Sequence, residues 1–125
     1  NGDKAMNQIT LMTSSIGNDA VDERGKIFPF IPKNDIKEFV YIETVPGQDR
    51  GHHWHPEFDE YIVLTSGNGK FIERTDNGTR EIKVTSGDCV HIPQGVYHTF
   101  IAETKCTSMS CLTKKWDDCD NPILR

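Results

Sequence analysis

The sequence lacks any apolar run of the roughly 18 residues that a membrane-spanning helix needs, so we expect no membrane partner. Its polar start, residues 1–8, also lacks the apolar core of a secretory signal. We therefore expect a cytoplasmic protein with a flexible N-terminus over residues 1–8. Residues 1–5 precede Met6, and we interpret them as an expression remnant in front of a natural start, while a signal that has already been cleaved stays open.

Clusters of positive charge are also missing. The chain has 14 Lys and Arg residues against 19 Asp and Glu residues, a net charge of −5, and no stretch concentrates the basic ones. A nucleic-acid partner therefore has no electrostatic basis. An anionic small molecule stays possible, because a few well-placed basic side chains suffice to bind it.

The cysteines form no metal or redox motif. None of the four, Cys89, Cys106, Cys111 and Cys119, has a partner at C-x-x-C spacing. Cys106 and Cys111 lie in one predicted strand at an odd offset, which places them on opposite faces and argues against a bond between them. We expect reduced thiols, while a disulfide from Cys119 stays open.

Helical periodicity is nearly absent, and short β-rich runs recur between Gly, Pro, Asn and Asp residues. This pattern is typical of a sandwich or barrel, and it predicts one all-β domain over residues 9–125. Asp76-Asn77-Gly78 is a strong hairpin signal between two of the runs. The predicted strands cover residues 39–45, 61–64, 71–74, 80–84, 89–92, 97–102 and 105–113.

Most of the histidines are clustered in one short stretch of the sequence. Three of the five histidines stand at positions 52, 53 and 55, with Glu60 close behind and His98 further along. Residues two apart in a strand share a face, so His53 and His55 can both point inward. Imidazoles and a carboxylate suit zinc, iron, manganese, nickel or copper. These residues are candidate metal ligands.

The spacing of this cluster resembles the two motifs of the cupin family. Gly47, His53, His55, Glu60 and Gly67 match the first motif, and Gly87, Pro93, Gly95 and His98 match the second. Ala102 stands where the family often has Asn, a position that is not a ligand. The resemblance implies a single-domain jelly-roll β-barrel that holds one divalent metal ion (zinc, manganese, iron or nickel) on His53, His55, Glu60 and His98.

A second resemblance suggests an activity. Asp22-Glu23-Arg24-Gly25 and Arg50-Gly51-His52-His53-Trp54-His55 are similar to segments of bacterial nucleotide-sugar 3,5-epimerases and 3,4-ketoisomerases. The cupin domain of a capsule-biosynthesis epimerase-reductase carries a similar Gly-x-His-Trp-His. The resemblance implies an epimerase or isomerase that acts on a keto sugar or nucleotide sugar in polysaccharide biosynthesis, by proton abstraction beside a ketone that the metal polarises.

The same resemblance suggests roles for residues outside the metal set. Tyr41 and Glu43 share one face of a predicted strand and are our candidate bases, and Arg24 is our candidate contact for a diphosphate. Cupins of this size often dimerise by strand exchange, so we expect a homodimer with residues 25–31 as the exchanged arm. A metal-dependent dioxygenase or lyase stays open, as does a non-catalytic module that binds a sugar or another small molecule.

Overall fold

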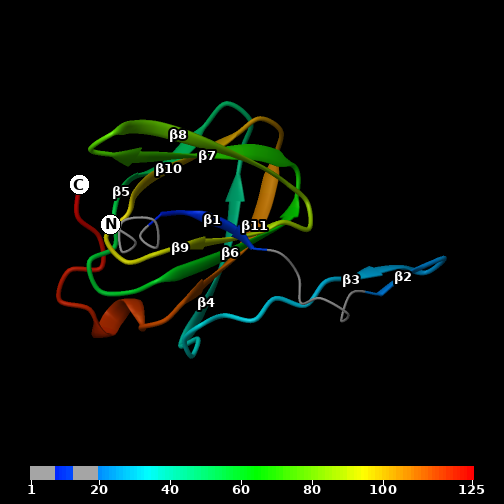
Figure 1. Ribbon diagram of the computed structural model, residues 1–125, viewed down its shortest axis with the longest axis horizontal. Coiled ribbons are helices and arrows are strands. Elements are labelled where there is room, and N and C mark those ends of the chain that lie inside the picture. Colours follow the sequence, from blue (N-terminus) through cyan, green and yellow to red (C-terminus); the bar gives the residue numbers. More distant parts are fainter. Residues whose placement is uncertain (1–7, 13–19) are drawn as a thin grey trace.

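A computed structural model describes residues 8–12 and 20–125 of the chain (Figure 1). The expression remnant predicted for residues 1–5, and all but Gln8 of the predicted flexible N-terminus, lie outside these residues. The described elements are β1 (Thr10–Met12), β2 (Ala20–Asp22), β3 (Gly25–Ile27), β4 (Glu38–Thr44), β5 (Asp49–His53), β6 (Glu60–Ser66), β7 (Asn68–Thr75), β8 (Gly78–Thr85), β9 (Cys89–Ile92), β10 (Tyr97–Ala102), β11 (Cys106–Leu112) and the short 3-10 helix η1 (Trp116–Asp118).

The strands of the barrel form two antiparallel sheets that lie face to face. One sheet has the order β1-β9-β6-β11-β4, and the other has the order β5-β10-β7-β8. Figure 1 shows the second sheet above the first, with the chain crossing repeatedly between them. This is the jelly-roll arrangement, so the predicted all-β fold is confirmed. Within the described residues, no helix is both long enough and apolar enough to cross a membrane.

Local sequence explains most of these strands. In β4, exposed residues alternate with half-buried or buried ones along the whole strand, as expected when one face packs against the core. The predicted hairpin is present, because β7 and β8 pair from Asn68–Thr85 to Thr75–Gly78 around a two-residue turn. Gly78 has φ of 115°, which a side chain would disfavour. The turn residues therefore set the register of this half of the barrel.

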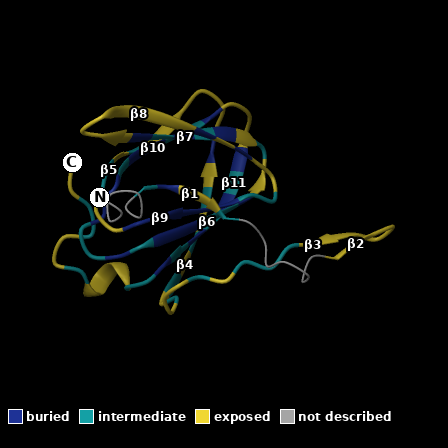
Figure 2. Ribbon diagram, viewed as in Figure 1, coloured by how far each residue is buried: buried dark blue, intermediate teal, exposed yellow. Residues whose placement is uncertain are grey.

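The apolar core lies between the two sheets, where Figure 2 shows the dark buried segments. It contains Leu64, Phe71, Val90 and Ile92, and it includes Ile9, which is fully buried beside β1. Other members are Ile82, Val84, Val96, Ala102 and Cys106. The core thus anchors the N-terminal strand as well as the central ones.

A hairpin projects from the barrel. β2 and β3 pair only with each other, and Figures 1 and 2 show them extending outward with exposed surfaces. Within one chain β3 pairs with β2, and the strand exchange predicted for residues 25–31 stays a prediction. Val21, Ile27 and Ile31 are each about two-thirds exposed or more, at 72%, 67% and 69%.

Candidate functional site

A cavity of about 510 Å³ lies between the two sheets. Its lining is mostly apolar, and its polar members include the three histidines and Glu60. Two residues of the C-terminal segment, Trp116 and Arg125, contribute to the lining. The lining residues are Val40, Ile42, Thr44, Asp49, Arg50, Gly51, His53, His55, Glu60, Ile62, Leu64, Phe71, His98, Phe100, Ser108, Ser110, Leu112, Trp116 and Arg125.

A β-bulge places His53 beside His98. β10 pairs His98 with His53 but Thr99 with Gly51, so His52 is the additional residue of β5. His52 has φ of 56° and Gly51 has φ of 110°. A Cβ atom at Gly51 would lie 2.7 Å from the carbonyl oxygen of His98. The close approach of the two strands therefore requires glycine at position 51.

Backbone carbonyls orient the other two imidazoles. His55 Nδ1 lies 2.9 Å from the carbonyl oxygen of Pro122, and His98 Nδ1 lies 2.9 Å from that of Val96. Because a carbonyl only accepts, each Nδ1 carries the proton and each Nε2 keeps its lone pair. Both Nε2 atoms face Glu60 Oε1, at 3.2 Å from His55 and 3.9 Å from His98.

The three imidazoles form a compact set with Glu60 at its side. The candidate ligand atoms of His53, His55 and His98 all lie within 4.8 Å of one another. Ring centroids are 4.7 Å apart for His53–His55, 5.0 Å for His53–His98 and 5.3 Å for His55–His98. Glu60 stands outside that set of mutually close atoms, but it contacts two of its members, and its other carboxylate oxygen accepts a hydrogen bond from Ser110. The four side chains thus lie together, and their binding of a metal stays a prediction.

Unpartnered atoms show what the set can hold. Three buried polar atoms among the described residues make no hydrogen bond, namely His53 Nδ1, His55 Nε2 and Glu60 Oε1. A buried polar atom without a partner is costly, and each unpaired atom here belongs to the same cluster. Two imidazole nitrogens and a carboxylate oxygen are the donors that a divalent transition metal takes. The residues present therefore fit a metal ion.

The protonation states suit that ion. Burial, together with the charges of His55 and His98, lowers the pKa of His53 from 6.5 to about 4. Burial also lowers the pKa of His98. Burial alone would raise the pKa of Glu60, but His55, His98 and Ser110 outweigh it and lower that pKa. Near pH 7 His53 and His98 are thus neutral imidazoles and Glu60 is an ionised carboxylate, the forms that bind metal.

Two predicted catalytic residues, Tyr41 and Glu43, lie outside the cavity of their own chain. Val40, Ile42 and Thr44 line the cavity, and strand alternation places Tyr41 and Glu43 on the opposite, exposed face of β4. The Tyr41 hydroxyl donates to Glu43 Oε2 over 2.9 Å. Neither side chain reaches the cavity of its own chain, so neither is retained as the base.

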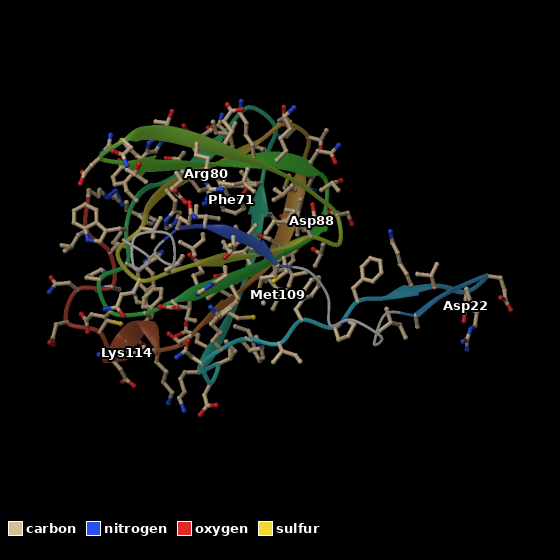
Figure 3. All side chains as sticks on the ribbon, in the orientation of Figure 1. Asp22, Phe71, Arg80, Asp88, Met109 and Lys114 are labelled. Atoms are coloured by element: carbon tan, nitrogen blue, oxygen red, sulfur yellow. The ribbon has the colours of Figure 1, made fainter. Side chains whose placement is uncertain are left out.

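Arg24 is also remote from the cavity. It lies between β2 and β3, where its guanidinium pairs with Asp22 over 2.6 Å and is 85% exposed. Figure 3 shows Asp22 at the far end of the projecting hairpin. The guanidinium therefore makes no contact with the site of its own chain.

The cavity also contains charged and aromatic residues that sequence reasoning missed. Asp49 and Arg50 begin β5, six residues or fewer before the first ligands, and their closeness to the motif was an available signal. Trp116 and Arg125 come from the C-terminal segment, which carries no recognisable pattern. Only the folded chain brings these two residues to the cavity.

Comparison with known proteins assigns the family. A model of the cupin domain matches residues 40–113, which include all four candidate ligands. The chain belongs to the cupin family. A comparison with curated proteins finds no match.

Several solved structures share the fold. The 3,4-ketoisomerase QdtA from Thermoanaerobacterium thermosaccharolyticum, in complex with TDP, has a TM-score of 0.79 and 20% identity over 94% of this chain and 87% of its own. A 3,4-ketoisomerase from Helicobacter canadensis has a TM-score of 0.80 and 15% identity, covering 94% and 90%. The capsular polysaccharide assembling protein CapF from Staphylococcus aureus has a TM-score of 0.64 and 24% identity, covering 92% of this chain and 34% of its own.

Proposed function

We propose that this cupin is a metal-dependent isomerase or epimerase of a keto sugar or nucleotide sugar, acting in bacterial polysaccharide biosynthesis. The observation that carries the proposal is the convergence of three imidazoles and Glu60, with unpartnered atoms, inside a cavity of about 510 Å³. The fold it shares with sugar 3,4-ketoisomerases supports the substrate class.

His53, His55, His98 and Glu60 would hold one divalent ion. Such an ion polarises a carbonyl oxygen and makes the neighbouring carbon-bound proton more acidic. The chain fixes the donors beforehand, because His55 and His98 are held by backbone carbonyls and Glu60 by Ser110. Side chains that need no rearrangement bind a metal at a lower entropic cost.

Arg50 supports an anionic substrate. Its Nε donates to Thr44 Oγ1 over 3.0 Å and its Nη2 donates to the carbonyl oxygen of Glu43 over 2.7 Å. Neutral acceptors thus orient the guanidinium at the cavity wall without cancelling its charge, and Nη1 stays available. A guanidinium in this state suits a phosphate or diphosphate group. One QdtA structure holds TDP-4-keto-6-deoxyglucose, a molecule with such a group.

Asp49 replaces Tyr41 and Glu43 as our candidate base. Besides Glu60, it is the carboxylate that lines the cavity within residues 8–12 and 20–125. His52 Nε2 lies 3.0 Å from Asp49 Oδ2, which limits the motion of the carboxylate. Asp49 Oδ1 is then free to accept a proton from a carbon beside the substrate ketone and to return it, as a general base must.

Hydrogen exchange tests this function. Metal-loaded protein would be incubated with TDP-4-keto-6-deoxyglucose in deuterated water, and ring-carbon deuterium followed by NMR. We expect exchange that falls about 100-fold or more in Asp49→Asn, as for loss of a general base, and disappears in His55→Ala. Glu43→Gln is the matched control, because Glu43 lies on the outer face of its strand, and it should retain the rate.

Other outcomes would favour the alternative functions. Oxygen consumption with an iron-loaded protein, without deuterium exchange, would indicate the dioxygenase, and cleavage of the substrate would indicate a lyase. Tight sugar binding with neither reaction would indicate a binding module. Any of these results would contradict the isomerase proposal.

We also propose a homodimer. β4 is an edge strand of its sheet, and Phe39 and Tyr41 on its outer face are 70% and 59% exposed. The projecting hairpin adds exposed Val21 and Ile27. Apolar surface next to an unpaired strand edge favours association, and a second copy of the hairpin offers matching apolar side chains.

A further inference from the structure

The C-terminal segment, residues 113–125, is held against the metal-site cluster at several points. Trp54 and Leu124 exchange two backbone hydrogen bonds of 3.0 Å, next to the bond between His55 and Pro122. Glu57 accepts from Lys114 Nζ over 2.8 Å and from the backbone N–H of Asn121 over 2.5 Å. The segment is therefore fixed in place as one wall of the site.

Trp116 presents an aromatic surface at this wall. Its backbone N–H donates to Glu38 Oε1 over 2.8 Å, and its ring lies 6.5 Å from that of His55 and 6.3 Å from that of Phe58. The residue lines the cavity and is still 39% exposed. An indole that is supported on one side and open on the other can stack on a planar or sugar ring.

Arg125 supplies a positive charge from the same segment. It lines the same cavity, and no ion pair joins it to a carboxylate in the described part of the chain. In a chain of net charge −5, a guanidinium that faces a cavity without an acidic partner is available to an anion.

We propose that Trp116 and Arg125 are specificity-determining residues, in which Trp116 stacks on the nucleoside and Arg125 contacts the diphosphate of a nucleotide-linked substrate. The inference rests on the proposed function and names the part of the substrate that the C-terminal segment recognises. Arg125 lies on the C-terminal segment and Arg50 on β5, so the diphosphate would be bound from two different elements.

Calorimetric titration tests the two contacts separately. TDP, thymidine and inorganic pyrophosphate would each be titrated into the metal-loaded protein and into its variants. Loss of one charge-assisted contact predicts that Arg125→Ala weakens TDP and pyrophosphate binding about tenfold and leaves thymidine binding unchanged. Trp116→Ala should weaken TDP and thymidine binding and leave pyrophosphate binding unchanged. Arg125→Lys should restore most of the affinity for pyrophosphate.

Lys115→Ala is the matched control, since Lys115 is an exposed cation of the same segment that does not line the cavity. It should change TDP affinity less than twofold, and all variants should keep the metal content and melting temperature of the parent. Equal effects of Arg125→Ala and Lys115→Ala on TDP would overturn the inference, as would the absence of any effect of Trp116→Ala.

The same titrations separate this inference from the proposed function. If the parent protein binds pyrophosphate through Arg125 but does not bind TDP, the result supports the anion contact and contradicts the nucleotide-sugar function. If both Trp116→Ala and Arg125→Ala weaken TDP binding but the parent protein catalyses no deuterium exchange, the result supports the specificity residues and contradicts the proposed catalysis. If neither TDP nor pyrophosphate binds, the inference is overturned.

Discussion

Replacing His53 by Gln is expected to flatten the acid dependence of stability in the metal-free protein. The folded-state pKa of His53 is about 4, below the unfolded value of 6.5, because burial penalises the charged ring. The folded state therefore binds fewer protons than the unfolded state between these values. The contribution of His53 to the unfolding free energy is therefore fully present above about pH 6.5 and is lost as the pH falls toward 4.

The size of this effect follows from the shift. A difference of 2.5 between 6.5 and about 4 corresponds to about 3.4 kcal/mol at 1.36 kcal/mol per unit. His53 is only partly buried, so solvent screening reduces the expected value to about 2 kcal/mol. The parent protein should lose that much more unfolding free energy than His53→Gln on acidification from pH 7 to pH 4.5.

Urea denaturation in the presence of a chelator, at several pH values in this range, measures the difference directly. Carboxylates titrate in both proteins, so only the difference between their pH profiles reports His53. His52→Gln removes an exposed histidine of the same strand and should keep the profile of the parent. Parallel profiles for the parent and His53→Gln would refute the burial of a neutral ring.

Three further predictions concern the barrel. Glu73 is 1% exposed, and it accepts hydrogen bonds from the backbone N–H of Ile9 over 2.6 Å and from Arg80 Nη2 over 3.0 Å. Glu73→Gln should therefore lower the unfolding free energy measured by urea titration by about 2 kcal/mol. Glu81→Gln, on the exposed face, should leave that free energy unchanged. Gly51→Ala should weaken zinc affinity at least tenfold by calorimetry, because its Cβ would displace His98; unchanged affinity would contradict the bulge geometry. Light scattering should give the mass of a dimer, and a concentration-independent monomer would refute the proposed association.

Sequence reasoning predicted what depends on local pattern. Strand alternation and the hairpin residues predicted the barrel strands between residues 39 and 113 closely, apart from β5, and the motif spacing predicted that His53, His55 and His98 lie together with Glu60 beside them. The odd offset of Cys106 and Cys111 also placed them on opposite faces of β11, and all four cysteines are free. The strands and the cysteine faces follow from residue periodicity, whereas the set of four ligands follows from the resemblance to the cupin motifs.

The features that sequence reasoning did not predict depend on side-chain orientation and on contacts between residues far apart in the chain. Alternation shows that Tyr41 and Glu43 share a face, but it does not show which face of an edge strand turns inward. The bulge at His52 has no sequence signature other than the adjacent Gly51. The contact of His55 with Pro122 joins residues 67 apart, so the role of the C-terminal segment appears only in the folded chain.

The central claim is that His53, His55, Glu60 and His98 hold one divalent ion, and metal analysis tests it most directly. Protein purified without an affinity tag would be analysed by mass spectrometry of its metal content. We predict about one equivalent of a transition metal per chain and its loss in His55→Ala and Glu60→Ala. His52→Asn should retain the metal, and asparagine is chosen because it tolerates the positive φ at position 52. A parent protein that holds no metal after incubation with zinc, manganese, iron or nickel would contradict the claim.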